Sequence, residues 1–169
     1  MFDEAAVEAT IRRLCPLYAQ IDLSVESVRD GIYRCRVPLN RANGNHLNTI
    51  HAAIQWTAAE MLGGLVAIRI IGPERLTAMH LAVQSVSIDF KRPARSAIIA
   101  EALFDEREAT QIRQLIDDGK DATFRVHAVV RSESGEAVAA TEAAYVLRQL
   151  RLAKQMPGWT MPRGKTGAN

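Results

Sequence analysis

Apolar residues recur at helical spacing through the middle of the chain. From residue 50 they follow a period of three to four residues, at Ile50, Ala53, Ile54, Thr57, Ala58, Met61, Leu62 and Leu65. This period is typical of an α-helix and not of a strand. We therefore expect one long helix over residues 50–70, capped by Asn48 or Thr49 and ended by Gly72-Pro73.

Alternating apolar and polar positions predict strands on both sides of this helix. Two strands precede it, 23–29 and 32–39, around a turn at Asp30-Gly31. Four strands follow it, at 81–90, 97–104, 123–131 and 137–147. Two further helices are expected, at 2–20, which Pro16 ends or bends early, and at 106–118.

This order of elements predicts an α+β fold in which an antiparallel sheet wraps around one long central helix. A chain of 169 residues fits a single domain, which we place at residues 1–152. Residues 153–169 hold two Pro and three Gly, and we expect them to form a tail that carries Trp159.

Composition excludes several classes of function. The net charge of +2 is too balanced to predict nucleic-acid binding. No run approaches the ~18 apolar residues of a membrane span, and the acidic N-terminus is unlike a signal peptide, so we expect a cytoplasmic protein. Cys15 and Cys35 are expected to be reduced. No His or Cys spacing predicts a metal site.

Candidate chemistry gathers between Asn45 and Glu60. Glu60 lies in the middle of the apolar helix, where a carboxylate requires a reason. Gly63 and Gly64 follow within a turn and allow a ligand or another backbone to approach closely. Partial burial would favour Glu60 as a base. The alternative is a structural ion pair with Arg69 or Arg125.

The start of the helix offers a second set of groups. A backbone N–H at Ala52 has no helical acceptor and can polarise a carbonyl. The Asn45 amide can hold substrate or water, or it can only shape an Asx-turn. His51 can take part in the chemistry, or it can only form a hydrogen bond at the helix start.

His51 and Glu60 are nine residues apart, and this spacing separates them on the helix. Nine residues turn an α-helix through about 900° and extend it by roughly 13 Å, so the two side chains point to opposite sides. If they cooperate, one copy of the chain supplies the helix start and another supplies Glu60. We therefore expect a homodimer or a dimer of dimers.

Two other groups are candidates for substrate binding. Trp56 precedes Glu60 by one turn and can line an acyl pocket or belong to the core. Lys91, Arg92 and Arg95 follow a strand and can bind the phosphates of coenzyme A, or form a solvated basic turn.

At these residues the chain resembles the hotdog-fold acyl-CoA thioesterases of the phenylacetate-pathway (PaaI-like) type. Asn45, His51 and Glu60 match the family's Asn, His-Gly-Gly and acidic positions, and the strand order fits over residues 22–148. The resemblance implies that Glu60 is the general base or nucleophile, that the Ala52 N–H polarises the thioester carbonyl, and that Asn45 orients water or acid. It also implies a site across a dimer interface and no cofactor besides the coenzyme A of the substrate.

The chain departs from the family pattern at two places. Ala52 and Ala53 replace the two glycines, and Val83 stands where many members have a Ser or Thr that orients water. An alternative is therefore a hotdog protein that binds acyl-CoA without hydrolysing it. A hotdog hydratase or dehydratase is a further alternative.

Overall fold

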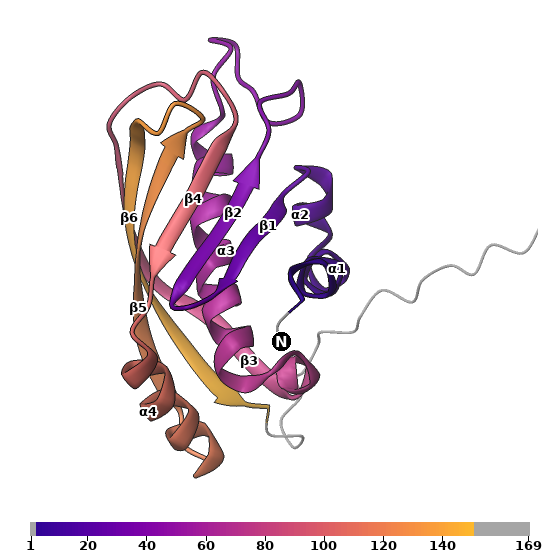
Figure 1. Cartoon of the computed structure of the whole chain (residues 1–169), viewed down its shortest axis with the longest axis vertical. Coiled ribbons are helices and arrows are strands. Elements are labelled where there is room, and N and C mark those ends of the chain that lie inside the picture. Colours follow the sequence, from indigo (N-terminus) through magenta and orange to yellow (C-terminus); the bar gives the residue numbers. More distant parts are fainter. Residues whose placement is uncertain (1–2, 151–169) are drawn as a thin grey trace, which may run out of the picture.

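The computed structural model describes residues 3–150, so the predicted tail and Trp159 lie outside the described residues. Six strands form one antiparallel sheet in the order β1-β2-β4-β5-β6-β3, and this sheet curves around helix α3 (Figure 1). The strands are β1 (Ser24–Arg29), β2 (Ile32–Val37), β3 (Met79–Phe90), β4 (Ile98–Leu103), β5 (Ala122–Ser132) and β6 (Ala137–Gln149). The predicted α+β fold, the hotdog arrangement, is confirmed.

Helix α3 (Ala52–Ile71) is the centre of the core. Leu62, Leu65 and Val66 are fully buried beneath the sheet. By length and composition α3 could cross a bilayer, but 67% of that span is buried inside the fold, as in the core helix of a globular protein. Gly72 ends the helix with φ of 83°, a conformation that glycine adopts without strain.

The N-cap of α3 is His51, so the prediction of Asn48 or Thr49 was wrong. The loop from Asn45 to Thr49 is closed by its own hydrogen bonds, and Asn48 has a left-handed φ of 53°. His51 has extended backbone, and its Nδ1 accepts a hydrogen bond from the Ala53 N–H at 3.1 Å. The helix therefore begins two residues later than the apolar pattern suggested.

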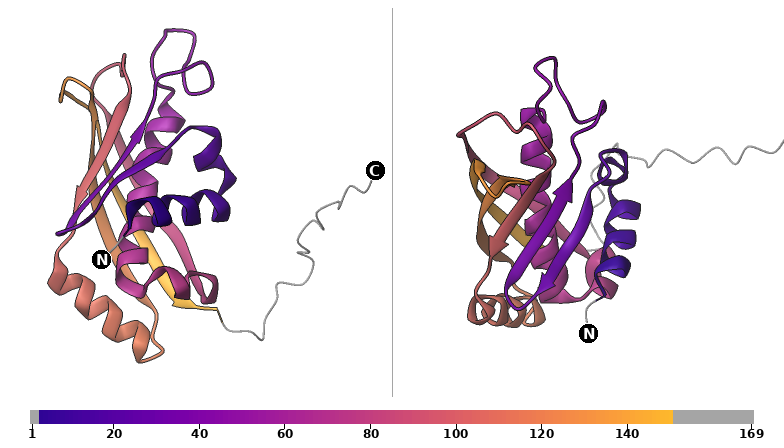
Figure 2. Two further views of the ribbon diagram at one scale, coloured as in Figure 1. Left: turned by 45° about the vertical axis from the view of Figure 1, so that its right-hand side comes forward. Right: turned by 45° about the horizontal axis from the view of Figure 1, so that its top comes forward.

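The N-terminal residues 3–23 form an arm of two helices, α1 (Glu4–Leu14) and α2 (Pro16–Gln20). Pro16 starts the second helix and separates it from the first, which agrees with the expected break. Val7 and Ile11 are buried where α1 packs against β1. Figure 2 shows the arm beside β1, close to α3.

The two remaining helices link successive elements of the fold. Helix α4 (Glu106–Asp117) links β4 to β5, as predicted. The 3₁₀-helix η1 (Pro73–Ala78) was not predicted, and it links α3 to β3. On β5 the burial alternates, with Phe124, Val126 and Ala128 facing the core, as expected from the pattern.

Candidate active site

Glu60 is half-buried and is held by two tyrosines. The Tyr18 hydroxyl, from α2, donates a hydrogen bond to Glu60 Oε2 at 2.7 Å. The Tyr145 hydroxyl, from β6, donates to the main-chain oxygen of Glu60 at 3.1 Å. The carboxylate thus has a phenol partner. Two arginines were considered above as ion-pair partners of Glu60. Of these, Arg125 pairs with Glu142 at 2.5 Å, and Arg69 lies 3.8 Å from Glu106.

The two phenols remain protonated well beyond neutral pH. Burial, followed by the nearby Glu60 carboxylate, raises the pKa of the Tyr18 hydroxyl far above its usual value. The same two causes, in the same order, raise the pKa of Tyr145. A phenol that keeps its proton is a permanent donor, so Tyr18 can fix one oxygen of Glu60 at any working pH.

The two glycines after Glu60 have different surroundings. A Cβ on Gly63 would lie 2.2 Å from the Tyr145 ring, so this glycine makes room for Tyr145 and not for a ligand. A Cβ on Gly64 would meet the Met61 methyl group at 3.2 Å. Gly64 is half-buried, and it is the glycine of the pair that stays available to a ligand.

The start of α3 is exposed and well anchored. His51, Ala52 and Ala53 are all exposed, and the Ala52 N–H belongs to the first helical turn, whose donors lack helical acceptors. Two main-chain hydrogen bonds fix the backbone just before Ala52. The Ile50 N–H donates to the Ala94 carbonyl at 2.8 Å, and the His51 N–H donates to the main-chain carbonyl of Asn43 at 2.9 Å. An N–H donor is therefore held in place at the surface.

The Asn45 side chain shapes the loop before the helix. Its Oδ1 accepts from the Leu47 N–H at 2.9 Å, and its Nδ2 donates to Thr49 Oγ1 at 2.9 Å. The Asx-turn alternative is therefore present. One N–H of the Asn45 amide has no acceptor among residues 3–150.

The basic group is partly paired. Lys91 contacts Asp89 at 2.7 Å, and Arg92 contacts Glu136 at 3.0 Å. Arg92 and Arg95 line an open groove of about 510 Å³ between the loop after β3 and the β5–β6 hairpin. Ala94 lies between these arginines, and its carbonyl accepts the Ile50 N–H, so the groove adjoins the start of α3.

A row of half-buried residues runs along one side of α3. Trp56, Thr57, Glu60 and Gly64 are half-buried at helical spacing, while the neighbouring positions Ala58 and Ala59 are buried. Trp56 packs partly against the core, so both of its predicted roles fit its position.

Strand β3 is an edge strand with apolar side chains on the helix side of the sheet. Val83, Val86 and Phe90 are 36%, 47% and 46% exposed. Val83 lies opposite Tyr145 in the register, and Val86 lies opposite the buried Ala143. Residues opposite one another share a face of the sheet, so Val83 lies beside Tyr145, whose hydroxyl binds the Glu60 main chain.

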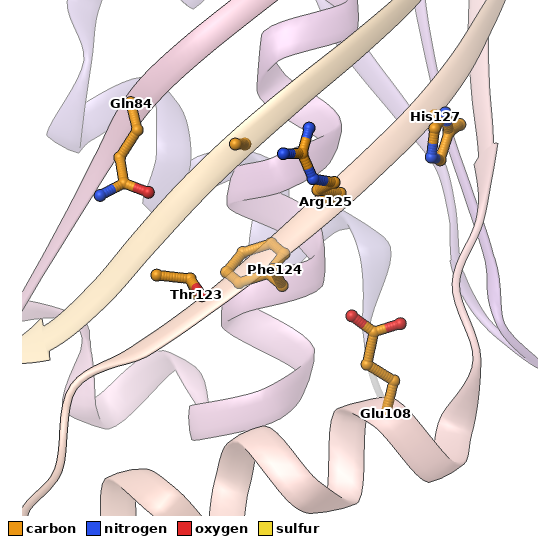
Figure 3. Close-up of a pocket in the computed structure, with 7 residues that line it drawn as sticks. Gln84, Glu108, Thr123, Phe124, Arg125 and His127 are labelled. Carbon is orange, nitrogen blue, oxygen red and sulfur yellow. The ribbon is translucent and has the colours of Figure 1, made fainter.

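Another hollow, of about 450 Å³, lies on the outer face of the sheet (Figure 3). Arg125 and His127 of β5 line it together with Glu108 of α4. No residue predicted for the site lies there. In the described part of the chain, no three His, Cys, Asp or Glu side chains gather as metal ligands would.

Sequence reasoning missed Tyr18 and Tyr145. Tyr18 is 42 residues from Glu60 and Tyr145 is 85 residues away, so no local spacing connects them. The one available signal was the pair of glycines beside Glu60, which indicated that something approaches the helix closely. The structure identifies the Tyr145 ring as that neighbour for Gly63.

The six-stranded antiparallel sheet around a buried central helix is the hotdog fold. Residues 3–147 match the family described as a domain of unknown function, DUF4442. The chain belongs to this family.

Three proteins are similar to this chain in sequence or in structure. A protein of Halobacterium salinarum named as a candidate esterase is 33% identical over 89 residues, which span 51% of this chain and 58% of that protein. A Pseudomonas aeruginosa structure of unknown function, described as a thioesterase candidate, has 24% identity and a TM-score of 0.74, and covers 88% of this chain and 97% of its own. A thioesterase structure from Haemophilus influenzae has 10% identity and a TM-score of 0.69, over 91% and 96% of the two chains.

Proposed function

We propose that this protein hydrolyses acyl-CoA thioesters, with Glu60 as the general base, in the manner of the PaaI-like thioesterases. The observation that carries the proposal is the Glu60 carboxylate itself, half-buried on a core helix, with one oxygen bound by Tyr18. The names of the Halobacterium relative and of the thioesterase structures agree with this chemistry.

The reaction follows from the groups present. Glu60 takes a proton from water as the water oxygen attacks the thioester carbonyl carbon. The Ala52 N–H at the start of α3 stabilises the oxyanion of the tetrahedral intermediate. The C–S bond then breaks, Glu60 returns the proton to the leaving sulfur, and the products are a carboxylic acid and free coenzyme A.

The Ala52 N–H and the Glu60 carboxylate of one reaction come, in this proposal, from two copies of the chain. The two groups are eight residues apart on one helix, which separates them by about 12 Å along its axis. Strand β3 supplies a suitable contact, because it is an edge strand with Val83, Val86 and Phe90 exposed. A two-fold dimer then contains two complete sites.

We assign substrate binding to residues near the Ala52 N–H and the Glu60 carboxylate. The groove with Arg92 and Arg95 adjoins the start of α3 and suits the phosphates of coenzyme A, with Lys91 at its edge. Trp56 and Gly64 lie on the half-buried stripe with Glu60 and suit the acyl group. Asn45, through its second amide N–H, can bind the substrate or the attacking water.

Replacing Glu60 by Gln tests the reaction. Gln keeps an oxygen that accepts from Tyr18 but cannot take a proton, so we expect kcat to fall at least ~100-fold with little change in melting temperature. The measurement is release of free thiol from a panel of acyl-CoA substrates. Glu108→Gln, on the exposed face of α4, is the control and should hydrolyse like wild type.

The competing function is acyl-CoA binding without turnover. Ala52 and Ala53 place methyl groups at the helix start, and the apolar Val83 lies on β3 opposite Tyr145. Acyl-CoA binding by calorimetry with no thiol release from any member of the panel would select this function. Unchanged turnover in Glu60→Gln would remove Glu60 from the mechanism.

A further inference from the structure

The hydroxyl of Tyr18 is the one side-chain donor to the Glu60 carboxylate among the described residues. The bond to Oε2 is 2.7 Å long, which is typical of a phenol bound to a carboxylate. Tyr18 and Glu60 are both half-buried, so water competes only weakly for the bond. The contact joins the N-terminal arm to the central helix.

The arm is held by hydrogen bonds between its own residues and by one bond to strand β1. Arg12 donates to the Leu23 carbonyl at 2.8 Å, and the Val25 N–H donates to Glu8 at 2.9 Å. The Leu23 N–H in turn donates to the Tyr18 carbonyl at 3.0 Å. These bonds hold the backbone of Tyr18 at a set distance from β1.

A second anchor connects the arm to the loop before α3. Asn43 is fully buried, and its Nδ2 donates to the Ile21 carbonyl and the Pro38 carbonyl, each at 2.9 Å. The main-chain carbonyl of Asn43 accepts a hydrogen bond from the His51 N–H. One residue therefore links the arm that carries Tyr18 to the start of the helix that carries Glu60.

The other oxygen of Glu60 has no such partner. The main-chain oxygen of Glu60 accepts a hydrogen bond from Tyr145 of β6, and Oε2 accepts one from Tyr18. No group within residues 3–150 donates a hydrogen bond to Oε1. The carboxylate is thus fixed at one oxygen and open at the other. A general base needs this arrangement, because it must present one lone pair to water in a constant direction.

We propose that Tyr18 is a positioning residue for Glu60, and that the N-terminal arm is thereby a working part of the site. This inference rests on the proposed thioesterase function. Tyr18 binds Oε2 and fixes the rotamer of Glu60, so that Oε1 takes the proton from the attacking water. Burial and the nearby Glu60 carboxylate raise the pKa of the Tyr18 hydroxyl, which favours its role as a hydrogen-bond donor.

The experiment compares Tyr18→Phe with Tyr33→Phe. Both changes remove one phenol oxygen and keep the ring, but Tyr33 is buried on β2, and the tyrosines that hydrogen-bond Glu60 in the described residues are Tyr18 and Tyr145. We expect Tyr18→Phe to lower kcat about tenfold while KM stays within about twofold. Tyr33→Phe should leave kcat unchanged, and any loss it causes should appear in the melting temperature.

Combining Tyr18→Phe with Glu60→Gln gives the decisive readout. If Tyr18 acts through Glu60, the double variant is no slower than Glu60→Gln alone. Additive losses, or wild-type kcat in Tyr18→Phe while Glu60→Gln is inactive, would overturn the role of Tyr18 and leave the thioesterase proposal standing. Absence of hydrolysis in wild type would overturn both.

Discussion

Gly63 and Gly64 are neighbours on α3, yet only the first is required by packing. A Cβ at Gly63 would lie 2.2 Å from the Tyr145 ring, which is itself stacked on Phe124 with ring centroids 5.2 Å apart. Tyr145 is buried and stacked on Phe124, so its ring has little room to move away from Gly63. At Gly64 the nearest atom is the end of the flexible Met61 side chain.

We therefore expect opposite effects from the same substitution. Gly63→Ala should lower the free energy of unfolding by about 1–3 kcal/mol through overpacking. Gly64→Ala should change it little or raise it by up to about 1 kcal/mol, since alanine is the better helix former. Urea unfolding of both variants is the measurement. Equal destabilisation would show that Tyr145 does not set the requirement.

At the scale of single residues, the sequence could identify some candidate site residues and not others. Glu60 could be singled out as a candidate because a carboxylate is unusual on an apolar helix. Tyr18 could not, because it lies on a short helix whose place depends on Asn43, Arg12 and Glu8, and no local pattern encodes these contacts.

At the scale of elements, the start of α3 depends on His51. Its imidazole accepts the Ala53 N–H, which satisfies one of the donors of the first turn. A side chain that fixes this turn also fixes the direction of the neighbouring Ala52 N–H. We propose that His51 acts through this cap.

Two variants separate capping from chemistry. His51→Ala removes the acceptor and should cost about 1 kcal/mol of unfolding free energy, together with part of kcat. His51→Asn restores a good N-cap and should recover both. Urea unfolding and thiol release on the same preparations give the two quantities. Recovery of stability without recovery of kcat would assign direct chemistry to the imidazole.

The elements themselves were largely predictable. Each predicted strand lies within two residues of the observed one at both ends, because alternation and turn residues such as Asp30-Gly31 are local signals. The cap of α3 was mispredicted because Thr49, a good cap by type, is buried and bonded to Asn45. The identity of a cap depends on the fold of the loop before it.

At the scale of the whole molecule, one sheet edge is unpaired and apolar. Strand β3 has twelve residues and, within residues 3–150, pairs only with β6, and Val86 is 47% exposed on its helix side. Long apolar edge strands are normally covered in soluble assemblies. This edge supports the proposed contact between two copies.

Val86→Lys tests that contact. A charge on this face should be buried by association and should therefore shift the protein toward monomer in sedimentation velocity, with loss of hydrolysis. Thr123→Lys, on the exposed face of β5, is the matched control and should leave the mass unchanged. A wild type that is monomeric at micromolar concentration and fully active would contradict the shared site.

The apolar length of α3 has a consequence for synthesis. The helix leaves the ribosome before β3, β4, β5 and β6, so it emerges before most of the sheet that buries it. Tyr145, which closes over Gly63 and binds the Glu60 main chain, arrives 85 residues after Glu60. The nascent chain thus exposes this apolar helix until the later strands have emerged, and completion of the core waits for β6.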